Sequence, residues 1–185
     1  MSVTETIKNR YGSKKGLLRY FAYKVLHSLG CYSAYAKVDL RRTKRLVFVC
    51  QGNICRSPLG QAVACQQGIE AISFGLNTRG DDPADIRAVE WGKLNGFDLS
   101  GHKTMRVDQY KPKEGDLIIG MEPKHIRDLV ARFSQAPVQI TLMGLWLKSP
   151  EIYLHDPYNA NEQYFVRCEQ VVADSTMGLL RAMKG

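Results

Sequence analysis

Short apolar runs alternate with helical patterns from residue 46 to the end of the chain. The run Leu46–Val49 contains no polar position, which is typical of a strand buried on both faces of a sheet. Similar runs predict strands at 71–74, 117–120 and 138–142. Spacings of three and four predict helices at 58–67, 122–133 and 161–183, and one from the Asp81–Pro83 turn to Leu94. This alternation predicts an α/β fold, with a four-stranded parallel sheet and helices on both faces.

The first 44 residues have a different pattern. Apolar residues within 14–29 recur at helical spacing among basic ones, which predicts an amphipathic helix that Gly30 ends. The charged stretch 41–45 then leads into the first strand. We therefore expect two parts, a basic amphipathic N-terminal extension at 1–44 and an α/β domain at 45–185.

The net charge of +8 is unevenly distributed along the chain. Residues 1–45 contain eleven Lys and Arg against two acidic residues, or +9, whereas residues 46–185 contain fifteen against sixteen, or −1. A body without excess positive charge gives no reason to expect nucleic-acid binding. The basic character belongs to the extension.

Cysteine usage and hydropathy indicate the compartment. Five irregularly spaced cysteines do not indicate a disulfide framework, and no metal-binding spacing is present, so we expect neither a structural disulfide framework nor a metal site. Charged and polar residues interrupt the apolar stretch of the extension, and no run of 18 apolar residues occurs, which argues against a signal peptide and a membrane span. We expect a cytoplasmic protein, either free or peripheral to a membrane.

The segment from Cys50 to Ser57, here called the Cys50 loop, has the strongest chemical pattern. A cysteine ends a buried strand, a short loop with Gly52 and Asn53 follows, and Arg56 then opens a helix. Backbone N–H groups of such a loop and the helix N-terminus attract an anion, and the same field stabilises a thiolate. Gly52 and Asn53 tolerate a left-handed backbone, and Arg56 can grip two phosphoryl oxygens.

A proton donor is expected in the long loop before the last helix. Asp156 lies there, followed by Pro157, which stiffens the loop, and by Tyr158, which can stack on an aromatic substrate. After thiolate attack on phosphorus, Asp156 can protonate the leaving oxygen and then activate water against the phosphocysteine.

The stretch Val49–Pro58 resembles the active-site loop of the low-molecular-weight protein tyrosine phosphatases. The resemblance covers about residues 45–184, and further matches follow in order: Ser73-Phe74-Gly75, Pro83-Ala84-Asp85, Gly96–His102 and Asp156-Pro157-Tyr158. It implies hydrolysis of phosphotyrosine in proteins through a phosphocysteine, without a cofactor.

The resemblance also implies a role for each matched residue. Cys50 is the implied nucleophile, Arg56 the phosphate clamp and Asp156 the general acid. Asn53, Ser57, Ser73 and His102 are implied to shape the loop and to steady the thiolate, and Cys55 to trap oxidised Cys50 as a reversible disulfide. The implied substrate-binding residues are Gln51, Gly52, Asn53, Ile54, Cys55, Ser57 and Tyr158.

The chain departs from the family at the short loop 76–82, which lacks a large aromatic or apolar substrate wall, and Phe74 replaces a small residue and is expected to fill part of that wall. Two other functions stay open. A thiol-dependent arsenate reductase uses a similar loop but needs further relay cysteines, and none lies between Cys65 and Cys168. A phosphate-binding module without catalysis is the second.

For the extension, three interpretations remain. The helix packs on the body through Leu18, Phe21, Val25 and Leu29, or it lies on an anionic membrane surface, or it docks a partner protein. The sequence does not decide between them.

Overall fold

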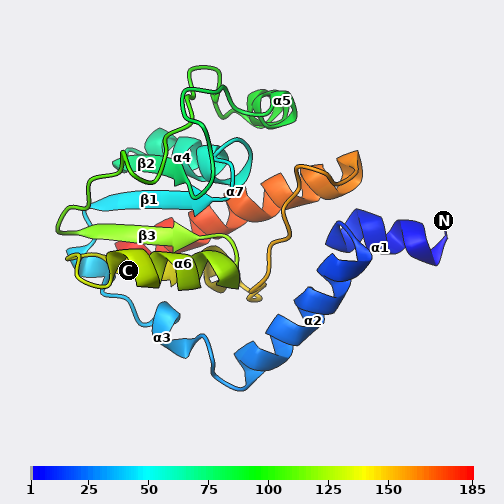
Figure 1. The fold of residues 1–185 in the computed structure, drawn as a ribbon, viewed down its shortest axis with the longest axis horizontal. Coiled ribbons are helices and arrows are strands. Elements are labelled where there is room, and N and C mark those ends of the chain that lie inside the picture. Colours follow the sequence, from blue (N-terminus) through cyan, green and yellow to red (C-terminus); the bar gives the residue numbers. More distant parts are fainter. Residues whose placement is uncertain (1) are drawn as a thin grey trace.

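A four-stranded parallel sheet lies at the centre of the computed structural model, which describes residues 2–185 (Figure 1). The strands are β1 (Arg45–Cys50), β2 (Ala71–Gly75), β3 (Asp116–Gly120) and β4 (Gln139–Leu142), in the order β2-β1-β3-β4. All three strand pairs are parallel, and Val47 of β1 lies opposite Ile72 of β2 and Ile118 of β3. The expected α/β fold with four parallel strands is confirmed.

Two cores cover the two faces of the sheet. Leu46 and Phe48 pack with side chains of α4 (Arg56–Gln66) and α7 (Glu162–Lys184), whereas Val47 and Val49 pack with Leu129 of α6 (Pro123–Phe133). These four side chains of β1 are fully buried. Strand β1 is therefore apolar at successive positions because each of its faces contacts a helical layer.

The remaining elements of the body differ from expectation at one point. Helix α5 (Ile86–Leu94) begins later than the turn at 81–83, because Asp85 is its N-cap and accepts the Arg87 N–H at 3.0 Å. A 3₁₀ helix, η2 (Met143–Trp146), follows β4. The carboxyl end of β1 points toward the loops that precede α4, α5 and α7, where a ligand site is expected in this fold.

The extension forms α1 (Val3–Tyr11), α2 (Lys14–Ser28), α3 (Ser33–Ala36) and a 3₁₀ turn, η1 (Leu40–Arg42). The sequence pattern predicted only α2. Figure 1 shows α1 near the start of α7 and α2 running away from the sheet. None of the described helices is both long and apolar enough to span a membrane.

Of the three interpretations of the extension, packing of α2 on the body through Leu18, Phe21, Val25 and Leu29 is contradicted by the structure. Leu18 and Leu29 are each 73% exposed, and Phe21 and Val25 are 50% and 59% exposed. The opposite face of α2 contacts the body instead, through Gly16, Arg19 and Tyr23.

Candidate active site

The Cys50 loop joins β1 to α4, and donors outside the loop bind its carbonyl oxygens. The carbonyls of Cys50, Gln51, Asn53 and Ile54 accept from Leu76 N–H (3.0 Å), Asn77 N–H (2.8 Å), His102 Nε2 (2.8 Å) and Asp85 N–H (2.8 Å), respectively. In a trans peptide the next N–H points opposite to the carbonyl. These four carbonyls, held from outside, therefore turn the amide groups that follow them to the inner side of the loop, where they can bind an anion.

Asn53 holds the loop in shape from its centre. Its φ of 58° lies in the left-handed region, which Asn tolerates better than most residues. Its side-chain amide donates to Ser57 Oγ (2.9 Å) and Ser73 Oγ (2.8 Å), and its Oδ1 accepts the Met105 N–H (2.8 Å). The expected left-handed backbone is thus present at Asn53, but Gly52 does not have a positive φ.

Two donors converge on the sulfur of Cys50. The backbone N–H of Asn53 lies 3.2 Å from Cys50 Sγ, and Ser57 Oγ lies 3.0 Å from it. Because Ser57 Oγ already accepts a hydrogen bond from Asn53, its own proton is free to point at the sulfur. In this arrangement both groups present a hydrogen to the sulfur.

A second layer of polar residues supports Asn53. Ser73 Oγ accepts from Asn53 and donates to Gln61 Oε1 at 2.7 Å, so each of its hydrogen-bonding roles is used. Burial lowers the pKa of His102, although its bond to the Asn53 carbonyl acts in the opposite direction. A neutral His102 with its proton on Nε2 donates to that carbonyl.

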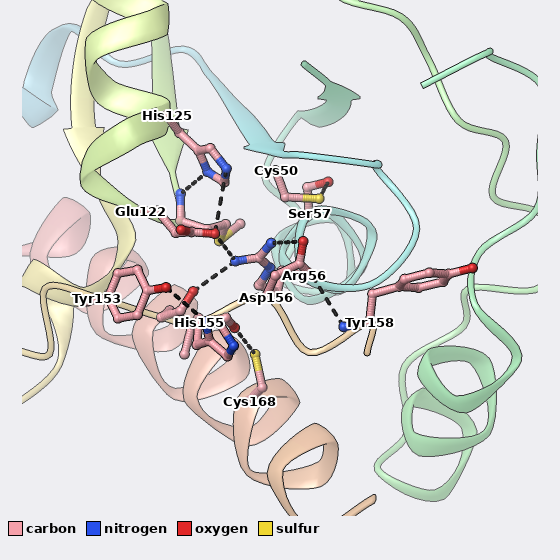
Figure 2. Close-up of polar contacts among 12 residues, drawn as sticks. Cys50, Arg56, Ser57, Glu122, His125, Tyr153, His155, Asp156, Tyr158 and Cys168 are labelled. Carbon is pink, nitrogen blue, oxygen red and sulfur yellow. Dashed lines mark hydrogen bonds and ion pairs between the residues drawn. The ribbon is translucent and has the colours of Figure 1, made fainter. Parts of the chain in front are cut away.

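Arg56 is almost fully buried and uses one end of its guanidinium for fixed contacts. Nη1 donates to Glu122 Oε1 (2.9 Å) and to the Leu154 carbonyl (2.8 Å), and Nη2 lies 3.2 Å from Asp156 Oδ2 (Figure 2). Burial disfavours the charged form, but Asp156 and Glu122 outweigh it and hold the pKa of Arg56 above its ordinary value. Among the described residues, nothing hydrogen-bonds Nε. The Nε and Nη2 groups of the guanidinium can therefore bind two phosphoryl oxygens, while the contacts of Nη1 hold the side chain in place.

The segment 153–158, here called the Asp156 loop, carries the candidate proton donor. Asp156 is 43% exposed at its side chain, and its Oδ1 accepts the Tyr158 N–H at 3.2 Å. Tyr164 and Cys168 of α7 donate to the carbonyl of His155, at 3.2 Å and 3.8 Å. Asp156 thus combines an anchored backbone with a carboxyl group that solvent and a substrate can reach.

Helix α2 and the turn before it also contact the Asp156 loop. Ser13 Oγ lies 3.2 Å from His155 Nε2, and His155 Nδ1 lies 2.8 Å from the Tyr153 hydroxyl. Arg19 donates to the same hydroxyl at 3.3 Å, and Tyr23 stacks on the Tyr153 ring with centroids 5.5 Å apart. The extension therefore contacts the residue that directly precedes Asp156.

Comparisons with known proteins agree with this geometry. The profile of the low molecular weight phosphotyrosine protein phosphatase family matches residues 45–185. The chain belongs to this family. It is 32% identical over 122 residues to the low molecular weight protein-tyrosine-phosphatase Etp of Escherichia coli K12, which covers 65% of this chain and 81% of Etp.

Solved structures of relatives have the same fold. Wzb of Vibrio vulnificus, in complex with benzylphosphonate, superposes with a TM-score of 0.66 at 27% identity over 76% of this chain and 99% of Wzb. The YwlE arginine phosphatase of Geobacillus stearothermophilus superposes with a TM-score of 0.65 over 76% of this chain and 93% of YwlE, but its 20% identity shows the fold alone.

A shallow groove of about 690 Å³ lies beside the Cys50 loop. Ile54 of the Cys50 loop lines it together with Tyr158, which is 53% exposed, and with residues at the start of α5. The ring of Tyr158 extends away from Arg56 toward α5 (Figure 2). Phe74 takes no part, because it is fully buried and stacks on Tyr110 in the core on the α6 side. The expectation that Phe74 forms part of a substrate wall is wrong.

The cysteine next to Arg56 is a buried thiol. Burial, with smaller contributions from Glu169 and Cys50, raises the pKa of Cys55 far above its ordinary value. Cys50 and Cys55 are both free in this structure. A disulfide between them stays a prediction, in which oxidation begins at Cys50 and Cys55 attacks as the second sulfur.

Sequence reasoning missed Glu122, His125, the Leu154 carbonyl and His155. Glu122 lies two residues past the carboxyl end of β3, where α/β proteins place ligand-binding groups, and this position could have indicated it. His125 accepts the Met121 N–H at Nδ1 (3.3 Å), and its Nε2 lies 3.8 Å from Glu122. Burial holds the pKa of His125 well below its ordinary value. A neutral imidazole ring therefore faces Glu122, the carboxylate that binds Arg56 Nη1.

Proposed function

We propose that this phosphatase hydrolyses phosphotyrosine in proteins through a phosphocysteine intermediate. The observation that carries the proposal is the arrangement around Arg56, which links the Cys50 loop to Asp156 through a 3.2 Å ion pair. A nucleophile, a cation for the phosphoryl group and a proton donor thereby meet at one point.

In the first step, the Cys50 thiolate attacks phosphorus. The S–P bond forms as the bond from phosphorus to the tyrosine oxygen breaks, and the protonated carboxyl of Asp156 gives its proton to that oxygen. Loop amides and the Nε–Nη2 edge of Arg56 hold the three remaining phosphoryl oxygens. Asp156 must leave Nη2 for this, which its exposed side chain permits.

In the second step, the Asp156 carboxylate accepts a proton from water. The water oxygen bonds to phosphorus, the S–P bond breaks, and inorganic phosphate and the thiolate are released. The Asn53 N–H and the Ser57 hydroxyl stabilise the negative charge that returns to the sulfur of Cys50. Neither step calls for a metal or a cofactor, because Arg56 and the amides supply the positive charge.

The groove supports an aryl phosphate in a protein as the substrate. The ring of a phosphotyrosine can lie in this groove while its phosphate lies in the Cys50 loop, and Tyr158 can contact the ring or the flanking peptide. Arg87 lies in the same groove and donates to the Tyr158 carbonyl at 2.9 Å. Its charge is already paired with Asp85 at 2.7 Å, so it contributes shape more than charge.

The test compares phosphotyrosine, phosphoserine and phosphoarginine peptides of one sequence. We expect kcat/KM to be highest for phosphotyrosine and expect a trapped phosphocysteine at Cys50 by mass spectrometry. Faster hydrolysis of phosphoarginine would mean that the proposed substrate class is wrong, but it would leave the proposed phosphocysteine mechanism unchanged. Arsenate-dependent oxidation of a thiol partner, without peptide hydrolysis, would replace the whole proposal.

A further inference from the structure

Five apolar side chains of α2 and that of its C-cap, Leu29, form one exposed line, here called the outer stripe. They recur at the spacings of one helical face, and the four largest exposed fractions are 73% for Leu18 and Leu29, 59% for Val25 and 50% for Phe21. Ala22 and Leu26 complete the stripe and are also exposed. A contiguous apolar line of this length on a surface indicates a binding site.

The opposite face of the same helix is already occupied by the body. Gly16 is the buried residue of α2 and Tyr23 stacks on Tyr153, and both lie on the side of the helix away from the stripe. Arg19, which donates to the Tyr153 hydroxyl, lies about a quarter turn from the middle of the stripe. The helix is thus attached through one face and presents its apolar face outward. Figure 1 shows α2 at the outside of the molecule, beyond the sheet and its covering helices.

Exposed lysines flank the outer stripe. Lys14 and Lys15 lie at its N-terminal end, Lys24 lies at its edge, and residues 1–45 carry eleven basic side chains against two acidic ones. We propose that the outer stripe is a docking surface for an anionic lipid bilayer, with α2 lying in the plane of the interface. An apolar face with lysines at its borders is the pattern of interfacial helices, whose leucines enter the acyl boundary while lysines meet lipid phosphates.

A second copy of the chain fits this surface less well than a bilayer does. Two stripes that pack together would bring the flanking lysines of both helices close, and the extension lacks the acidic residues that would balance them. An anionic bilayer supplies the missing negative charge. Phosphatase activity on a small substrate does not depend on this surface, since Cys50, Arg56 and Asp156 lie outside it.

The experiment measures co-sedimentation of the full chain with vesicles. One set contains phosphatidylcholine only, and the other also contains phosphatidylserine. We expect binding to the anionic vesicles, weakening as salt is raised. Leu18→Gln with Val25→Gln and Leu29→Gln should reduce binding by about 10²-fold or more. Lys14→Gln with Lys15→Gln and Lys24→Gln should reduce it by about fivefold per lysine.

Matched variants on the body serve as controls. Leu94→Gln removes a leucine that is 86% exposed on α5, and Lys93→Gln with Lys111→Gln and Lys113→Gln removes the same charge from exposed positions of the body. Both should bind vesicles as the wild type does, and all variants should hydrolyse a small aryl phosphate equally.

Three results would overturn the proposal. The first is absence of binding to anionic vesicles at low salt, and the second is equal loss in the stripe variant and the Leu94 control. The third is a dimer in sedimentation analysis that the stripe substitutions make monomeric while vesicles are not bound, because the outer stripe would then cover a second copy.

Discussion

The Cys50 loop and the Asp156 loop meet at Arg56, but the chain stabilises them in different ways. The Cys50 loop is held by residues of the body alone, mostly through its own backbone and the buried side chain of Asn53. The Asp156 loop is held by side chains from α7, from Arg56 and from the extension, which is 142 residues away at the Ser13–His155 contact. The first depends on the body alone, with a partner 52 residues away at the Asn53–Met105 contact, and the second also depends on the extension.

The largest effect should come from the sulfur at the base of the Cys50 loop. We expect Cys50→Ser to reduce kcat by about 10³-fold or more, because a serine hydroxyl is not ionised by two hydrogen bonds at neutral pH. Aryl phosphate hydrolysis under steady-state conditions measures this. Cys65→Ser, at an exposed cysteine, is the control and should keep full activity. Residual Cys50→Ser turnover above about a tenth of wild type would exclude the covalent mechanism.

The local character of the Cys50 loop explains why its residues could be predicted. A run of apolar residues, a loop with Gly52 and Asn53, and Arg56 at a helix start are all contiguous, so the sequence alone places them together. The four strands were predictable for the same reason, since continuous apolar runs need no knowledge of their partners. The partners of Asp156 could not be predicted, because a carbonyl such as that of Leu154 has no signature in sequence.

The extension shows the same limit. Leu18 and its neighbours give the pattern of a buried face, and the pattern predicts an amphipathic helix correctly. It does not say whether the apolar side meets the body, and in the structure Tyr23 and Gly16 meet it instead. Helix α1 was missed because its apolar positions are few, and Ser2 caps it without a strong hydrophobic pattern behind it.

The second prediction concerns the proton donor. Asp156→Asn keeps the shape of the side chain but cannot donate a proton, so hydrolysis of poor phenol leaving groups should slow by about 10²–10³-fold. Good leaving groups need little protonation and should lose much less. A series of substituted phenyl phosphates measures the dependence. Equal losses across the series would show that Asp156 is not the general acid.

The third prediction uses the buried carboxyl group of Glu169, which interacts electrostatically with Arg56 and with Cys55 of the Cys50 loop. Burial raises the pKa of Glu169 to about 8, and its carboxyl oxygens have no hydrogen-bond partner within residues 2–185. The native state therefore keeps a proton that the unfolded chain releases near its ordinary pKa of 4.5. Stability should fall as pH rises from about 4.5 to about 8 and change little beyond, by a few kcal/mol from this group.

Glu169→Gln tests this because the amide is neutral at every pH. Urea unfolding at several pH values should give a free energy of unfolding that falls less steeply with pH in the variant than in the wild type. Glu162→Gln, at an exposed glutamate that begins α7, is the matched control. Parallel curves for wild type and Glu169→Gln would mean that Glu169 is ionised in the native state.

The fourth prediction tests how far Asn53 stabilises the Cys50 loop. Asn53→Ala removes the donors to Ser57 and Ser73 and the acceptor for Met105, and it places alanine at a left-handed φ. We expect a loss of about 1–3 kcal/mol in stability and about tenfold in kcat. Asn53→Gly relieves the strain but not the lost bonds. Full activity in Asn53→Gly would show that the side chain does not shape the site.

The smallest expected effect comes from the contact between the extension and the Asp156 loop, which the Cys50 loop does not share. Ser13→Gly removes the hydroxyl that contacts His155, while glycine costs an N-cap only a few tenths of a kcal/mol. If the extension helps to place Asp156, kcat for poor leaving groups should fall about two- to fivefold, with little change for good ones. Ser2→Gly alters the cap of α1 in the same way, away from His155, and is the control. Identical rates in the two variants would mean that the Asp156 loop keeps its place without the extension. A loss that is equal for all leaving groups would point to the Cys50 loop instead, because only the loss of the proton donor depends on the leaving group.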